Sequence, residues 1–113
     1  MSKESLLEAF ANSIPDPVVI ADTQHKVIFI NKAAREHFEN GDNLLGRSLM
    51  ECHNADSKHK MEEVLAILSQ GEEDEVQITD KPGQRTFMRA VKNSRGNLLG
   101  YYERYMYWPK RID

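Results

Sequence analysis

The feature that most constrains the fold is the long segment from Leu98 to about Trp108. It contains all four tyrosines and the only tryptophan of the chain. Side chains along a β-strand alternate between its two faces, so Tyr101 and Tyr105 would share one face and Tyr102 the other. A large exposed aromatic patch is rare on a monomer. We therefore expect both faces of this strand to be covered, one by the core and the other by a partner.

Four further segments have the composition of strands. The β-branched runs 18–21 and 27–30 flank a polar turn and predict an antiparallel hairpin. Residues 76–78 and 86–92 are separated by a turn that contains Pro82 and Gly83, and they precede the tyrosine-rich strand. The sequence thus predicts five antiparallel strands.

Helical patterns lie before and between these strands. Apolar residues recur at helical spacing up to Ile14, with Ser2 as a possible cap, and Asn31 is a good N-cap for a short helix over 32–38. The strongest helical pattern spans Met61 to Leu68 and ends before Gly71. Five strands with helices on one face predict an α+β domain with an additional N-terminal helix.

The composition excludes several classes of protein. A chain of 113 residues fits one domain, and a net charge of −3 with scattered basic residues is not typical of a nucleic-acid-binding protein. No apolar run reaches the roughly 18–20 residues that span a bilayer. The single cysteine, Cys52, excludes an internal disulfide and fits a reducing cytosol, so we expect a cytoplasmic protein. No phosphate-binding, HExxH or GxSxG motif is present, and we expect no enzymatic activity.

Four segments together resemble the PAS domain family: 14–22, 27–34, 45–48 and 93–100. The resemblance covers nearly the whole chain and implies an N-terminal helix (1–14), a PAS domain (15–108) and a C-terminal tail (109–113). It implies a five-stranded antiparallel sheet that folds over helices around a small cavity. Members of the family sense ligands, light or redox state, or they dimerise. The sequence Cys52-His53-Asn54 is similar to a prokaryotic subgroup found beside hemerythrin-like domains.

The resemblance implies a stand-alone sensory domain that binds an unidentified small ligand and reports through a homodimer or a signalling partner. One alternative is a pure interaction module whose cavity is filled by its own side chains. Another is a haem or redox sensor that uses His53 or Cys52. No cofactor is required by the sequence, and no metal site is expected. The residues expected on the cavity side are His53, Cys52, Asn54, Met61 and Leu65.

The histidines differ in what their positions allow. His59 lies nearly opposite the apolar face of its helix, so it is expected in solvent rather than on haem. His53 precedes this helix, and its ring could hold the loop by a structural hydrogen bond or enter the cavity. His25, in a hairpin turn, and His37, on a short helix, are both expected at the surface.

A dimer interface is predicted from two apolar surfaces that need covering, the alternative being an N-terminal helix that only completes the core of its own chain. One is the stripe of the N-terminal helix, and the other is the outer side of the last strand. Pro109 stands where signal-transmitting relatives continue into a linker helix, which favours signalling through surface contacts. The residues expected at the interface are Leu6, Leu7, Phe10, Ile14, Tyr105 and Tyr107.

Overall fold

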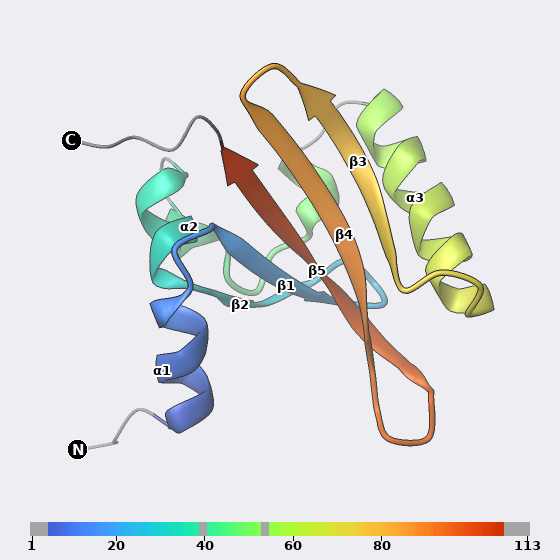
Figure 1. The fold of residues 1–113 in the computed structure, drawn as a ribbon, viewed down its shortest axis with the longest axis horizontal. Coiled ribbons are helices and arrows are strands. Elements are labelled where there is room, and N and C mark those ends of the chain that lie inside the picture. The colour runs from blue at the N-terminus through green and yellow to red at the C-terminus, as the bar shows by residue number, and fades with distance from the viewer. Residues whose placement is uncertain (1–4, 39–40, 53–54, 108–113) are drawn as a thin grey trace.

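The fold is the predicted α+β arrangement, seen in a computed structural model that describes residues 5–38, 41–52 and 55–107 (Figure 1). The elements in chain order are α1 (Leu6–Ser13), β1 (Val18–Asp22), β2 (Val27–Ile30), α2 (Lys32–His37), the 3₁₀ turns η1 (Gly41–Leu44) and η2 (Leu49–Cys52), α3 (Ala55–Gln70), β3 (Glu75–Lys81), β4 (Gln84–Lys92) and β5 (Leu98–Tyr107). Within the described residues, no helix is long and apolar enough to cross a membrane.

The five strands form one antiparallel sheet in the order β2-β1-β5-β4-β3. The tyrosine-rich strand β5 is central and pairs with β1 on one side and β4 on the other. Strand β5 approaches β1 closely at Gly100, where a Cβ atom would lie 2.2 Å from the carbonyl oxygen of Ala21. Only glycine therefore fits this position without moving a strand.

The hydrophobic core lies between one face of the sheet, here called the inner face, and α2, η2 and α3. Helix α3 buries Met61, Val64 and Leu68, as its periodicity predicts, and ends before Gly71, whose φ is +80°. In Figure 1 α3 runs beside β3, whereas α1 and α2 lie at the other end of the sheet. The core residues are Val19, Ala21, Val27, Ile30, Ala34, Leu49, Met61, Val64, Leu68, Met88 and Tyr101.

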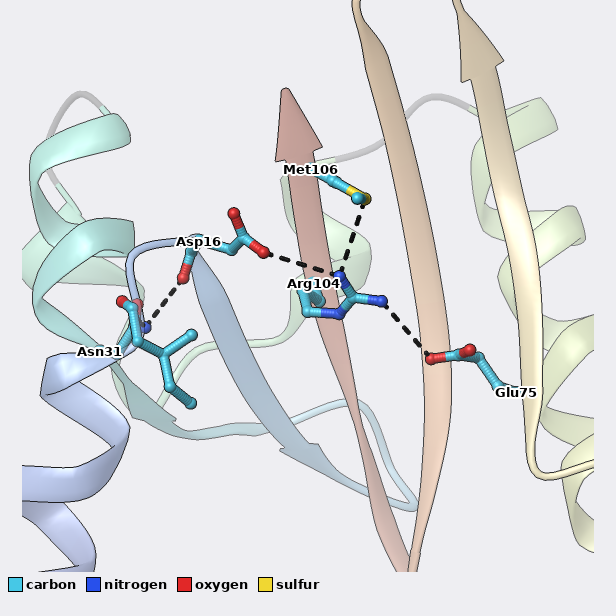
Figure 2. A network of polar contacts seen from close by, with 6 residues as sticks. Asp16, Asn31, Glu75, Arg104 and Met106 are labelled. Carbon is cyan, nitrogen blue, oxygen red and sulfur yellow. Dashed lines mark hydrogen bonds and ion pairs between the residues drawn. The ribbon is translucent and has the colours of Figure 1, made fainter. Parts of the chain in front are cut away.

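Asn31 connects the N-terminal helix, the first strand and α2. It is completely buried, and its Oδ1 atom accepts hydrogen bonds from the backbone N–H of Ala34, at 2.9 Å, and of Val18, at 3.0 Å. The first of these bonds is the predicted N-cap of α2. Figure 2 shows the amide group of Asn31 directed at the segment between α1 and β1. The amide Nδ2 donates to the carbonyl oxygens of Ala11, Ile14 and Asp16.

The cap of the first helix differs from the expectation. Helix α1 begins at Leu6, and the hydroxyl oxygen of Ser5 accepts the N–H of Glu8 at 3.1 Å, so Ser5 is the cap. Ser2 lies outside the described residues. Several serines near a helix start fit the same capping pattern, and the pattern alone does not choose among them.

Candidate functional site

A cavity of about 220 Å³ lies between α3 and the inner face of β3, β4 and β5. We call it the inner cavity. Its walls combine the apolar side chains of Met61 and Ile78 with several groups that can form hydrogen bonds. The lining residues are Ser57, Lys60, Met61, Ile78, Thr79, Lys81, Gln84, Thr86, Glu103 and Tyr105.

The most unusual residue of the inner cavity is Glu103, whose exposed fraction is only 1%. It alternates with Tyr101 and Tyr105 on the inner side of β5, and the Tyr105 hydroxyl donates a hydrogen bond to its Oε2 atom. A carboxylate in a core is costly unless charged or hydrogen-bonding partners compensate for the lost water. The strand thus holds an acidic group at the inner end of a small cavity.

A second hollow, of about 390 Å³, lies on the opposite face of the sheet. We call it the outer groove. Helix α1 forms one wall, and outward-facing residues of β1 and β5 form the other. The lining residues are Leu7, Phe10, Ala11, Ile14, Val18, Ile20, Tyr102 and Arg104.

Strand β5 connects the inner cavity with the outer groove, because neighbouring residues project to opposite faces. Arg104 follows Glu103 and lies on the outer face (Figure 2). Its guanidinium lies 3.6 Å from Asp16, in the segment between α1 and β1, and 3.9 Å from Glu75 on β3. It also stacks over the Phe87 ring, 4.8 Å from the centroid. These contacts hold the base of α1 to the central strand.

The expectation that His25 lies at the surface is wrong. Its side chain is partly buried, and its Nδ1 atom lies 2.7 Å from the hydroxyl of the completely buried Tyr101. Burial lowers the pKa of His25, whereas the carboxylates of Glu62 and Asp22 act in the opposite direction. Burial, together with the nearby Glu103 and Asp22 carboxylates, raises the pKa of Tyr101. His25 also adopts a left-handed backbone conformation in this turn, with φ of 69°.

The other histidines with an expected position lie outside the core. His59 is exposed and lies 2.8 Å from Glu63 on the same helix, which confirms that its side faces solvent. His37 is also exposed, as expected, although its ring contacts those of Phe38 and Tyr105. Within the described part of the chain, no three histidine, cysteine or acidic side chains are grouped as metal ligands.

The residues expected on the cavity side are only partly brought together. Met61 lines the inner cavity, and the half-buried Leu65 packs against the core beside it. Cys52 ends η2, but its side chain, together with His53 and Asn54, lies outside the described residues.

The residues expected at a dimer interface separate into two groups. Leu7, Phe10 and Ile14 line the outer groove, and Leu6 is exposed beside them on α1. Tyr105 instead lies on the inner side, where it lines the cavity and contacts the Phe38 ring at 5.4 Å. The reason is that every second residue of a strand projects to the same face, so Tyr105 lies on the same side of β5 as Tyr101 and Glu103. Tyr107 ends β5, and its side chain lies outside the described residues.

Sequence reasoning did not select Glu103, the buried acid of the inner cavity. A signal was present, because Glu103 alternates with tyrosines in a strand whose two faces are both expected to be covered. A charged residue on a covered face of a strand is rarely placed there for packing alone. The remaining polar lining residues are spread over α3, β3, β4 and β5, so no single segment of the sequence marks them as one site.

Comparisons with known proteins agree with this architecture. A family model described as "PAS domain" matches residues 7–105. A search of curated proteins gave no match.

Solved structures with this fold come from several bacteria. A C-terminal domain from Streptococcus mutans is 18% identical, with a TM-score of 0.76, over 91% of this chain and 83% of that one. The PAS domain of Bordetella pertussis BvgS is 17% identical, with a TM-score of 0.67, over 93% and 85% of the two chains. A PAS domain from Colwellia psychrerythraea is 19% identical, with a TM-score of 0.66, over 95% and 100%. With the family match over most of its length, the chain belongs to the PAS domain family, whose members are sensory and signalling modules.

Proposed function

We propose that this PAS domain binds a small ligand in the inner cavity and reports its presence by pairing with a second copy through α1. The observation that carries the proposal is the inner cavity itself, which is bounded by α3 and three strands and contains the buried Glu103. Ligand sites are typically concave and largely apolar, with a few polar groups that fix orientation. The inner cavity has this composition.

The ligand would be small. Pockets for drug-sized molecules have volumes of roughly 300–1,000 Å³. The inner cavity, at about 220 Å³, is smaller and suits a compact metabolite. Hydroxyl groups of Thr79 and Thr86 and the amide of Gln84 offer both donors and acceptors to such a molecule.

The signal would pass through β5 to α1. A ligand that contacts Glu103 acts on the residue next to Arg104, which is paired with Asp16 at the base of α1. The backbone N–H of Tyr105 also donates to the carbonyl of Pro17, at 3.0 Å. A ligand shifts a conformational equilibrium only by binding one state better than the other. Small movements of β5 would therefore favour one position of α1.

A second copy is the occupant that we propose for the apolar side of α1. Leu6, Leu7 and Phe10 have exposed fractions of 84%, 77% and 63%. These side chains continue the apolar wall of the outer groove, and no residue of α1 is buried within the chain. An apolar surface of this kind is stabilised when a matching surface covers it, and an identical chain provides one in a twofold dimer.

The dimer is tested by placing a charge in the middle of the apolar side. Phe10→Asp should convert a dimer to a monomer in sedimentation or light scattering, because an aspartate in an apolar interface loses its water without gaining a partner. Ala9→Asp adds the same charge to the same helix outside the outer groove and should leave the dimer intact. A wild-type chain that is monomeric at high concentration would contradict this part of the proposal.

Ligand binding is tested by a thermal-shift screen of small metabolites against the wild-type chain. A compound that binds the folded state should raise the melting temperature. Thr79→Trp, which fills the inner cavity, should abolish the shift, whereas Thr23→Trp, in the exposed hairpin turn, should preserve it. If no compound shifts the melting temperature of the wild-type chain, an interaction module without a ligand replaces the sensor as the proposed function.

A further inference from the structure

The ionisable side chains of the inner cavity differ between its interior and its exposed side. Glu103 supplies a carboxyl group that is almost completely buried. Lys60 on α3 and Lys81 at the end of β3 line the same cavity, but both residues are exposed. An acidic group thus lies inside, and two basic groups lie where the cavity meets solvent.

The buried carboxylate selects the inner end of a ligand. A carboxylate accepts up to about four hydrogen bonds, so a ligand can donate to Glu103 in addition to the Tyr105 hydroxyl. Hydrogen bonds between an ammonium and a carboxylate are shorter and stronger than neutral ones, and the low dielectric of the interior increases the attraction. An amine is therefore favoured at this position, and an anion is repelled.

The two lysines determine which chemical group of a ligand is favoured at the outer end of the cavity. Exposed ammonium groups attract an anion less strongly than buried ones, because water screens them, but two of them lie beside the same opening. Between the charged ends, Met61 and Ile78 provide apolar contact for a short carbon chain. The volume of about 220 Å³ allows a molecule of amino-acid size.

We infer that the ligand of the inner cavity is a small zwitterion, with its amine on Glu103 and its carboxylate near Lys60 and Lys81. This inference rests on the proposed ligand-binding function and specifies the class of ligand. The carbon chain lies between α3 and the sheet, so the ligand joins the helix to the central strand.

The test compares probes of different charge, titrated calorimetrically into the full chain. The panel contains the common α-amino acids, 4-aminobutyrate and 6-aminohexanoate, each with the amine and the carboxylic acid of the same carbon chain as single-charge counterparts, for example butylamine and butyrate for 4-aminobutyrate. We expect at least one zwitterion to bind, and its amine-only and acid-only counterparts to bind more than about 10-fold more weakly.

Substitutions then test which side chains of the cavity bind each end of the ligand. Glu103→Gln should weaken the zwitterion by about 10- to 100-fold, the usual effect of losing a hydrogen bond to a charged group. Glu73→Gln removes the same charge from an exposed position outside the cavity and should have no effect. Lys60→Gln combined with Lys81→Gln should weaken the zwitterion by a smaller factor and leave butylamine unchanged. If Glu103→Gln does not fold, the inference is judged by the affinities of the wild-type chain for the zwitterion, the amine and the acid.

Failure of this inference differs from failure of the proposed function. If only neutral or acidic metabolites bind, and Thr79→Trp blocks them, the cavity is a ligand site but the zwitterion is wrong. Unchanged zwitterion affinity in Glu103→Gln would also overturn the inference. If neither the panel nor the metabolite screen gives any binding, both fail together.

Discussion

Replacing Asn31 by alanine should destabilise the domain far more than the loss of an ordinary helix cap. The side chain accepts two backbone N–H groups and donates to three carbonyl groups, and all of it is buried. The amide of Val18 would be left buried without its acceptor, which costs about 1–3 kcal/mol, and loss of the cap on Ala34 costs about 1 kcal/mol. The carbonyl of Ala11 keeps the N–H of Ile14, so it adds little. The expected loss is about 3 kcal/mol.

Urea unfolding followed by circular dichroism measures this loss. A small domain is stable by about 5–15 kcal/mol, so the change is a large fraction of the total. With an m-value of about 1.5 kcal/mol/M, the midpoint should fall by about 2 M while the slope stays constant. Ser5→Ala is the matched control, because Ser5 makes one exposed capping bond, and it should cost below about 1 kcal/mol. If Asn31→Ala costs no more than Ser5→Ala, the buried bond from the Val18 N–H contributes nothing measurable and the reasoning is wrong.

Two further predictions concern β5 and its neighbours. Because burial lowers the pKa of His25, the unfolded chain binds a proton near pH 6.5 before the folded chain does. The free energy of unfolding should therefore fall as the pH decreases through about 6.5 and level off below the pKa of His25 in the folded chain. His25→Asn should remove the part of this pH dependence that comes from His25. A variant with the same pH profile as the wild-type chain would contradict the prediction. Gly100→Ala should cost at least about 3 kcal/mol, since its Cβ would meet the Ala21 carbonyl oxygen at 2.2 Å, a backbone atom that cannot rotate away. Gly71→Ala, which has open space but a φ of +80°, should cost only about 1 kcal/mol, and equal losses in urea unfolding would refute the steric argument.

Much of the fold could be predicted because its signals are local. The alternation of β5, the periodicity of α3 and the cap at Asn31 each depend on residues close together in the sequence. The order of the segments matched the PAS family, and the family match over residues 7–105 confirmed it. Met61 followed from the same periodicity, because a residue on the apolar face of α3 must approach the sheet.

The candidate site was harder to predict because it is formed by residues from four elements. Glu103 becomes part of a cavity only when β5 lies in the sheet opposite α3, and Thr86 reaches the cavity only through the register that pairs it with Tyr105. The same register places Tyr105 inside, away from the α1 surface. His25 was expected in solvent because a turn residue usually points outward, whereas its inward position depends on Tyr101, distant in the sequence.

The sequence by itself determined the class of fold, the order of the main elements and the alternation of side chains along β5, because these follow from spacing along one chain. Only the tertiary structure decided that the face of β5 with Glu103 lines the inner cavity and that the face with Arg104 lines the outer groove. The physical reason is that the burial of a side chain and its pairing with an opposite charge depend on the residues that surround it in space. Those surroundings are supplied by segments that meet only after the sheet has closed over its helices.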